Sequence, residues 1–201
     1  MVSFDDEPLI LVDADDREIG YLDKAAAHSG TGKLHRAFSA FVFDRRGRLL
    51  LQRRAAGKRL WPGFWSNTCC SHPRRGETVE AAAHRRLVEE LGFDCPLEFL
   101  FKFEYQAQFD ADGAERELCW VFAGVSDDAA QVNPTEIEAV RYASPAALDA
   151  EIARAPRNFT PWFLIEWARI RARHSGGGSE HGNGAFCKLQ SSGGAAASRA
   201  E

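Results

Sequence analysis

The sequence predicts an α+β domain in which a mixed β-sheet is flanked by helices. Apolar runs of strand length recur along the chain, at 9–12, 38–43, 49–52 and 118–122. Helical patterns accompany them but do not alternate regularly with the strands, as they would in a parallel α/β protein. The length of 201 residues and the hydrophobic content of 45% suit one domain with a full core.

The predicted elements have local signals. Residues 45–48, RRGR, read as a hairpin turn between the strands at 38–43 and 49–52. In TVEAAAHRRLVEELGF, apolar residues recur at steps of three and four from Val79, which predicts a helix that Gly92 ends. A second helix opens at SPAALDAEIA, where Ser144 caps and proline takes the first helical position. A third covers TPWFLIEWARIRAR.

Composition excludes several classes of protein. The chain has 25 Lys+Arg against 29 Asp+Glu and a net charge of -4, whereas a nucleic-acid-binding domain is normally basic. The N-terminus, MVSFDDEPLI, lacks the basic and apolar regions of a secretory signal, and no apolar run is long enough to span a bilayer. We therefore expect a cytoplasmic protein, monomeric, that binds a small molecule and has no nucleic-acid or membrane partner.

The five cysteines do not indicate a structural framework. Their number is odd, their spacing is irregular and no paired CxxC predicts a zinc site, so we expect free thiols. From 175 to 201 the chain is rich in Gly, Ser and Ala, which predicts a disordered tail in which His181 and Cys187 have no function. The domain is expected to cover 1–174.

The predicted helix after Thr78 carries a motif. From Ser71 the chain reads S-x5-E-x7-R-R-L-V-E-E-L-G-F, which resembles the Nudix signature G-x5-E-x7-R-E-U-x-E-E-x-G-U, where U is a bulky aliphatic residue. The resemblance implies a Nudix-like fold with a loop–helix–loop that presents carboxylates to a divalent cation holding a diphosphate; carboxylates and phosphates are hard ligands that suit Mg²⁺. Two positions differ from the Nudix signature: Ser71 stands in place of its first glycine, and Arg86 stands in place of a glutamate of the metal-binding set. Hydrolysis is therefore in doubt.

Other segments resemble type 1 isopentenyl-diphosphate isomerases, a branch of the Nudix fold. They are LDKAAAH, KLHRAFS, QRRAAGKRLWPGFWSN, TCCSHP, FEYQAQF, ERELCWVF and FTPWF, which follow in order over about residues 8 to 170. The resemblance implies conversion of isopentenyl diphosphate to dimethylallyl diphosphate, by protonation and deprotonation through a carbocation-like intermediate, in isoprenoid biosynthesis.

The resemblance also assigns roles to residues. The catalytic set is Cys70, Glu117, Tyr105 and Trp162; the residues that bind the diphosphate are Lys24, Arg54, Lys58 and Arg86, with a Mg²⁺ that bridges the phosphates to Glu90. The ligands of a Mn²⁺ or Zn²⁺ ion are His28, His35, His72, Glu115 and Glu117. The sequence does not decide which of Cys70 and Glu117 protonates the substrate.

The chemistry of the residues agrees with these roles. Glu115 and Glu117 are two apart on a predicted strand, so both point to one face. Imidazoles completed by carboxylates suit Mn²⁺, Zn²⁺ or Fe²⁺ better than Mg²⁺. Cys70 and His72 share a face if their segment is extended, and Cys69 then points into packing.

Two other functions remain open at this point. A Nudix diphosphohydrolase acting on a nucleotide derivative explains Glu77, Glu89 and Glu90 but leaves Arg86 and the His/Cys/Glu set without a purpose. A catalytically inactive Nudix-like module that binds a ligand or a partner protein explains Arg86 but not the metal-type ligands.

Overall fold

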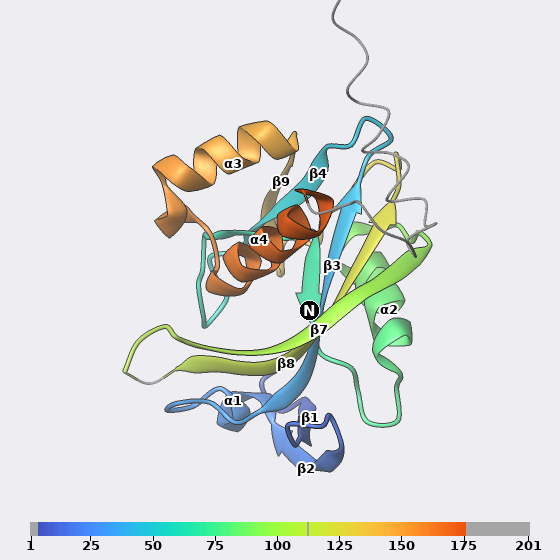
Figure 1. The fold of residues 1–201 in the computed structure, drawn as a ribbon. Coiled ribbons are helices and arrows are strands. Elements are labelled where there is room, and N and C mark those ends of the chain that lie inside the picture. Colours follow the sequence, from blue (N-terminus) through green and yellow to red (C-terminus); the bar gives the residue numbers. More distant parts are fainter. Residues whose placement is uncertain (1–3, 112, 176–201) are drawn as a thin grey trace, which may run out of the picture.

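The structure is a computed structural model that describes residues 4–111 and 113–175 (Figure 1). It confirms the α+β class, with one mixed sheet of nine strands flanked by helices. The strands are β1 (Pro8–Val12), β2 (Glu18–Asp23), β3 (His35–Phe43), β4 (Leu49–Arg54), β5 (Trp65–Ser66), β6 (Cys69–Ser71), β7 (Leu97–Gln108), β8 (Ala114–Val125) and β9 (Ile137–Ala143). The helices are α1 (Lys24–Ala27), α2 (Val79–Leu91), α3 (Pro145–Arg154), the 3-10 turn η1 (Pro156–Asn158) and α4 (Pro161–Ser175). Apart from the last residue of α4, the predicted tail at 175–201 lies outside the described residues.

The helix caps agree with their sequence signals. The Thr78 hydroxyl accepts a hydrogen bond from Ala81 N at the start of α2, and Gly92 ends that helix in the left-handed region at φ 74°. The Ser144 hydroxyl likewise accepts from Ala147 N at the start of α3. The patterns did not predict β2, β5, β7 or β9. In β7, exposed polar residues alternate with buried ones, so the strand lacks the continuous apolar run of the predicted strands.

Strand β3 is the centre of the sheet. It pairs in parallel with β8 and antiparallel with β1, β4 and β6. Its register sets His35 opposite Glu117, and β7 sets Tyr105 opposite the same glutamate. Residues directly opposite one another share a face of the sheet, so these three side chains form one row across three strands. On the other side of β3, Ser39 lies opposite Cys70 of β6.

Both faces of β3 are covered by helices (Figure 1). Phe41 and Phe43 belong to a core cluster with residues of α4, and the Phe41 ring stacks on Phe163 at 6.0 Å. Phe38 and Val42, which alternate with them, belong to a second cluster with residues of α2. The apolar run at 38–43 is therefore continuous because both faces of the strand are buried.

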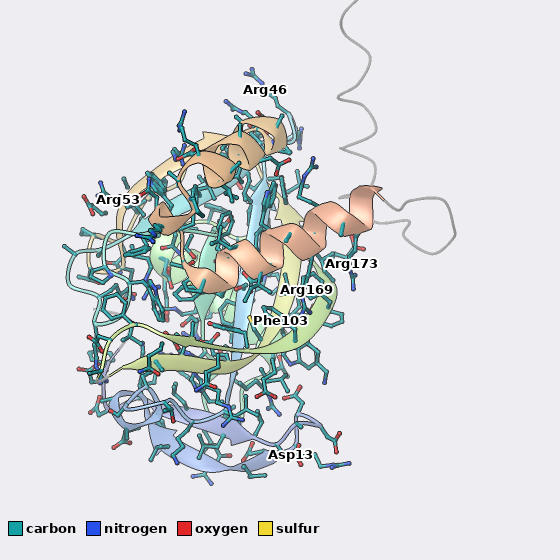
Figure 2. All side chains as sticks on the ribbon, turned by 60° about the vertical axis from the view of Figure 1, so that its left-hand side comes forward. Asp13, Arg46, Arg53, Phe103, Arg169 and Arg173 are labelled. Atoms are coloured by element: carbon teal, nitrogen blue, oxygen red, sulfur yellow. The ribbon has the colours of Figure 1, made fainter. Side chains whose placement is uncertain are left out.

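Helix α4 is fixed to β7 by cation–π contacts. Figure 2 shows Arg169 and Arg173 projecting from α4, with Phe103 next to Arg169. The Arg169 guanidinium lies 4.5 Å from the Phe103 ring centre, and that of Arg173 lies 4.7 Å from Phe101. These contacts fix the helix that carries Trp162. None of the described helices combines the length and apolar character needed to cross a bilayer.

Candidate active site

The five predicted metal ligands come together. They are contributed by the end of α1, the start of β3, the residue after β6 and two positions on β8: His28, His35, His72, Glu115 and Glu117. One ligand atom of each lies within 4.8 Å of those of the others, and all five side chains are buried. The row across β3, β8 and β7 brings His35 and Glu117 together, and the two-residue step along β8 adds Glu115 to the same face.

Backbone carbonyls orient two of the imidazoles. His28 Nδ1 lies 2.7 Å from Lys24 O, and His35 Nδ1 lies 2.7 Å from Lys33 O. A carbonyl only accepts, so each Nδ1 carries a proton, and in the neutral form of each ring the lone pair is on Nε2. Both Nε2 atoms point into the cluster, at 2.7 Å from Glu115 Oε2 and 3.7 Å from Glu117 Oε1. Such carbonyl contacts fix the tautomer of metal-binding histidines.

The cluster fits a divalent cation. His28 Nε2 and Glu115 Oε2 are buried and make no hydrogen bond with any described residue, although they lie 2.7 Å apart. His72 Nε2 lies 3.2 Å from both His35 Nε2 and Glu117 Oε1. Buried lone pairs this close to one another are costly unless a cation lies between them. Imidazole nitrogens with carboxylate oxygens are a donor set typical of a transition metal such as Mn²⁺ or Zn²⁺.

The cluster opens into a cavity of about 920 Å³. The predicted catalytic residues, Cys70, Glu117, Tyr105 and Trp162, all border it. Cys70 belongs to β6 and Glu117 to β8, on opposite sides of β3. The Tyr105 hydroxyl donates a 2.8 Å hydrogen bond to Glu117 Oε2. Trp162 is held by a 3.0 Å hydrogen bond from its Nε1 to Ser66 Oγ.

Burial keeps the Cys70 thiol and the Tyr105 phenol protonated beside the ionised carboxylate of Glu117. Burial raises the pKa of the Cys70 thiol to about 12, although the nearby Arg54 opposes the shift. Burial, and then the charge of Glu117, raise the pKa of Tyr105 well above its usual value. Burial is the largest influence on Glu117 and acts to raise its pKa, but the hydrogen bonds and charges of His35, Tyr105 and His28 together outweigh it, and the pKa is lowered. The pocket thus combines a neutral thiol with a charged carboxylate.

The predicted diphosphate-binding residues border the same cavity: Lys24, Arg54, Lys58 and Arg86. Burial, and then the charge of Lys58, lower the pKa of Lys24. The Arg54 guanidinium lies 5.2 Å from the Trp162 ring centre, and its Nη1 lies 4.0 Å from Cys70 Sγ. Arg54 therefore connects the cationic part of the pocket with the proposed catalytic part.

Arg86 makes ion pairs inside the protein. Its side chain is 3% exposed, and Nη2 lies 2.5 Å from Glu90 Oε1 and 3.5 Å from Glu136 Oε2. Its Nη1 donates to Glu89 at 3.1 Å. Glu90, the predicted Mg²⁺ residue, lies behind this guanidinium and does not border the cavity. An arginine at this position therefore compensates the carboxylates that surround it.

The sequence reasoning missed two buried glutamates. Glu136 is 2% exposed and borders the cavity, but it lies outside any recognisable motif. Glu166 is fully buried on α4, where Oε1 lies 3.4 Å from Cys119 Sγ. A charged residue within the apolar stretch FLIEW was a signal for Glu166; Glu136 had none because its partners come from distant segments.

Comparisons with known proteins agree with this site. The model of the NUDIX domain family matches residues 33–163. A Deinococcus radiodurans structure, DR0079, superimposes with a TM-score of 0.61 at 24% identity, covering 74% of this chain and 90% of that one. A MutT NUDIX hydrolase from Burkholderia pseudomallei superimposes with a TM-score of 0.56 at 22% identity, covering 69% and 98%. At this identity, the structures establish the fold alone, which is that of a NUDIX protein.

The curated relatives define the branch. Isopentenyl-diphosphate Delta-isomerase 2 of Photorhabdus laumondii is 49% identical over 176 residues, covering 82% of this chain and 99% of the relative. Isopentenyl-diphosphate Delta-isomerase of Pectobacterium atrosepticum is 44% identical over 162 residues, covering 81% and 90%. The chain belongs to the isopentenyl-diphosphate Delta-isomerase family of NUDIX proteins.

Proposed function

We propose that this chain isomerises isopentenyl diphosphate to dimethylallyl diphosphate, a step of isoprenoid biosynthesis, in the cavity described above. The relatives at 44–49% identity are named for this activity. The observation that carries the proposal is that one cavity is bordered by a thiol, a buried carboxylate, an aromatic ring and several cations. An isomerase of a prenyl diphosphate needs an acid, a base and an anion site together.

Cys70 and Glu117 are the proposed acid–base pair. The reaction adds a proton at the terminal alkene carbon and removes one from C2, so the substrate keeps its composition. Cys70 is protonated because burial raises its pKa to about 12, and Glu117 is ionised because its pKa is lowered. Because their strands lie on opposite sides of β3, the two groups are suited to approach the alkene from different directions. In these protonation states the thiol is the group that can give a proton and the carboxylate is the group that can take one.

The other two proposed catalytic residues, Tyr105 and Trp162, orient the Glu117 carboxylate and stabilise the positive charge of the intermediate. Tyr105 donates to Glu117 and holds the orientation of the carboxylate. Trp162 is proposed to face the carbocation-like intermediate; a desolvated cation–π contact contributes about 2 kcal/mol, which is roughly thirtyfold in rate. Positioning and the negative carboxylate must supply the larger part.

Divalent cations are part of the proposal. His28, His35, His72, Glu115 and Glu117 are the proposed ligands of a Mn²⁺ or Zn²⁺ ion, for which their donor set is suited. When bound, the ion supplies positive charge that fixes the Glu117 carboxylate. Mg²⁺ is proposed to enter with the diphosphate, while Lys24, Arg54, Lys58 and Arg86 provide the cationic wall. A bridge from this ion to Glu90, as expected from the sequence, would require Glu90 to exchange its ion pair with Arg86 for the metal.

The two alternative functions are less well supported. A hydrolase needs carboxylates free to hold metal, but Arg86 is paired with Glu90 at 2.5 Å. A binding module without activity gives no reason for five buried ligands that meet within 4.8 Å beside a cavity thiol. We also propose the cytoplasmic location and the monomeric state expected from the sequence. Gel filtration tests the monomeric state.

Proton NMR in D₂O tests the activity. Purified protein with isopentenyl diphosphate and Mg²⁺ is expected to give dimethylallyl diphosphate with deuterium in a methyl group and without free phosphate. Phosphate release without isomerisation would instead identify a hydrolase. Unchanged substrate with folded, metal-loaded protein would contradict the proposal.

A further inference from the structure

Glu136 joins two cations that border the cavity. Its carboxylate forms an ion pair with Lys58 Nζ, and the same oxygen, Oε2, lies 3.5 Å from Arg86 Nη2. The Glu136 side chain is 2% exposed, so its charge is withdrawn from water and needs cationic partners. Lys58 belongs to the loop after β4, and Arg86 belongs to α2. One buried carboxylate thus fixes two distant segments to each other.

The backbone of Glu136 holds the same loop. Its carbonyl accepts a 3.0 Å hydrogen bond from Ala55 N, and Ala55 O in turn accepts from Lys58 N at 3.1 Å. The loop also contains Trp61 at φ 47°, a left-handed conformation unfavourable for a tryptophan. A loop with such a residue keeps its shape only when other contacts determine it. Glu136 supplies contacts of this kind through both its backbone and its side chain.

The negative charge of Glu136 also orders a lysine of the cationic wall before the diphosphate binds. Lys58 and Lys24 both border the cavity, and Glu136 places its carboxylate directly against Lys58. A lysine side chain has a flexible stem and loses rotamer freedom when it binds an anion. The Lys58 side chain is 22% exposed, so an anion can reach it, and its ion pair with Glu136 already restricts its rotamers. Part of the entropy cost of ordering Lys58 is therefore met before the anion binds.

We propose that Glu136 is a positioning residue of the diphosphate site, which holds Lys58 and the loop 55–61 in the arrangement that binds the diphosphate. The inference rests on the proposed function, because it assigns the anion to this cavity. Glu136 acts through Lys58 and does not itself contact the substrate.

Titration calorimetry with inorganic pyrophosphate and Mg²⁺ tests the role without relying on turnover. In Glu136→Gln, we expect the Kd for pyrophosphate and the KM for isopentenyl diphosphate to rise about tenfold, with kcat changed less than about threefold, because ground-state binding is lost. Glu151→Gln is the matched control, since it breaks the 2.8 Å pair with Arg141 outside the cavity and is expected to leave both constants unchanged.

A double-mutant cycle identifies the residue through which Glu136 acts. If it acts through Lys58, Glu136→Gln adds no further loss of pyrophosphate binding in a Lys58→Met background. Losses of pyrophosphate binding that add up in the double variant would overturn the proposal. A Glu136→Gln variant that binds pyrophosphate as tightly as the parent, or more tightly, would also overturn it, because the carboxylate would then only repel the anion. Should that variant fail to fold, Glu136→Asp, which keeps the charge at shorter reach, is expected to show the same loss.

The same titrations separate this inference from the proposed function. A parent protein that binds neither pyrophosphate nor isopentenyl diphosphate contradicts the proposed function itself. A parent protein that binds pyrophosphate and isomerises, with Glu136→Gln unaffected, contradicts only the role of Glu136.

Discussion

The Tyr105 hydroxyl donates a 2.8 Å hydrogen bond to Glu117 Oε2, while the other oxygen of that carboxylate lies 3.2 Å from His72 Nε2. Glu117 therefore belongs both to the ligand cluster and to the cavity wall. Its position follows from the register of β7, β8 and β3, which aligns Tyr105, Glu117 and His35 in one row. The phenol and the imidazoles together determine where the carboxylate oxygens point.

Tyr105→Phe is expected to lower kcat while leaving the metal content unchanged. A hydrogen bond to a charged group contributes about 1.5–3 kcal/mol, which corresponds to roughly 10–100-fold in rate if the bond matters in the transition state. Steady-state kinetics and elemental analysis measure the two effects. Tyr142→Phe, on the partly exposed surface of β9, is the control. Activity within about twofold of the parent would show that Tyr105 does not orient the base.

Cys70→Ala is expected to reduce isomerisation by about 10²–10⁴-fold, the usual contribution of a general acid or base. The Kd for pyrophosphate should stay unchanged, because the thiol does not belong to the cationic wall. Cys95→Ala, a buried cysteine of the cluster that contains α2, should leave the rate unaffected. Parallel loss of rate in both variants would point to a folding defect instead.

The state of the Cys70 thiol is tested by alkylation. Burial raises its pKa to about 12, so the reactive thiolate is scarce in the folded protein up to about pH 9. Iodoacetamide is therefore expected to modify Cys70 slowly at pH 7–9, with a rate still rising at the upper end. Mass spectrometry of the modified peptide locates the reaction. A rate that levels off near the usual cysteine pKa of about 8.5 would contradict a buried, protonated thiol.

The purified protein is expected to carry about one equivalent of Mn²⁺ or Zn²⁺, given its donor set. His35→Ala should lose this ion, because His35 is fully buried within the cluster. His84→Ala should retain it, since His84 pairs with Asp94 on the surface at 2.6 Å. Removal of the ion should lower the melting temperature, because it binds only the folded chain. Equal metal content in both variants would place the ion elsewhere.

Glu166 should make the folded protein less stable as the pH rises. Burial raises its pKa from 4.5 to about 8, so the folded state binds the proton more tightly than the unfolded state. The stabilising contribution is complete below pH 4.5 and is lost as the pH rises through about 8. The full effect is on the order of 5 kcal/mol.

Glu166→Gln removes the titrating group and is expected to flatten this dependence. Urea unfolding of both proteins at pH 5, 7 and 9 gives the difference in free energy of unfolding, in which shared contributions such as metal binding cancel. The variant should gain on the parent as the pH rises. A constant difference between the two proteins would mean that Glu166 is ionised in the folded state throughout.

Much of the fold and of the site was predictable because its signals are local. The caps Thr78 and Ser144 bond to backbone groups three residues away, so they are legible in any short window. The His, Glu and Cys residues around the cavity lie in short segments whose order matched a known family, and the structure brings all five predicted metal ligands together. Strand β7 was missed because its exposed polar positions interrupt the apolar pattern.

The sequence by itself determined which chemical groups are present: a thiol, histidines, carboxylates, cations and an arginine in place of a signature glutamate. The tertiary structure alone decided how they are paired. The parallel register of β3 with β8 sets His35 opposite Glu117, and the fold places Glu136, just before β9, against both Lys58 of the loop after β4 and Arg86 of α2. Such pairings join residues tens of positions apart, and their energies depend on burial and distance, which arise only when the chain folds.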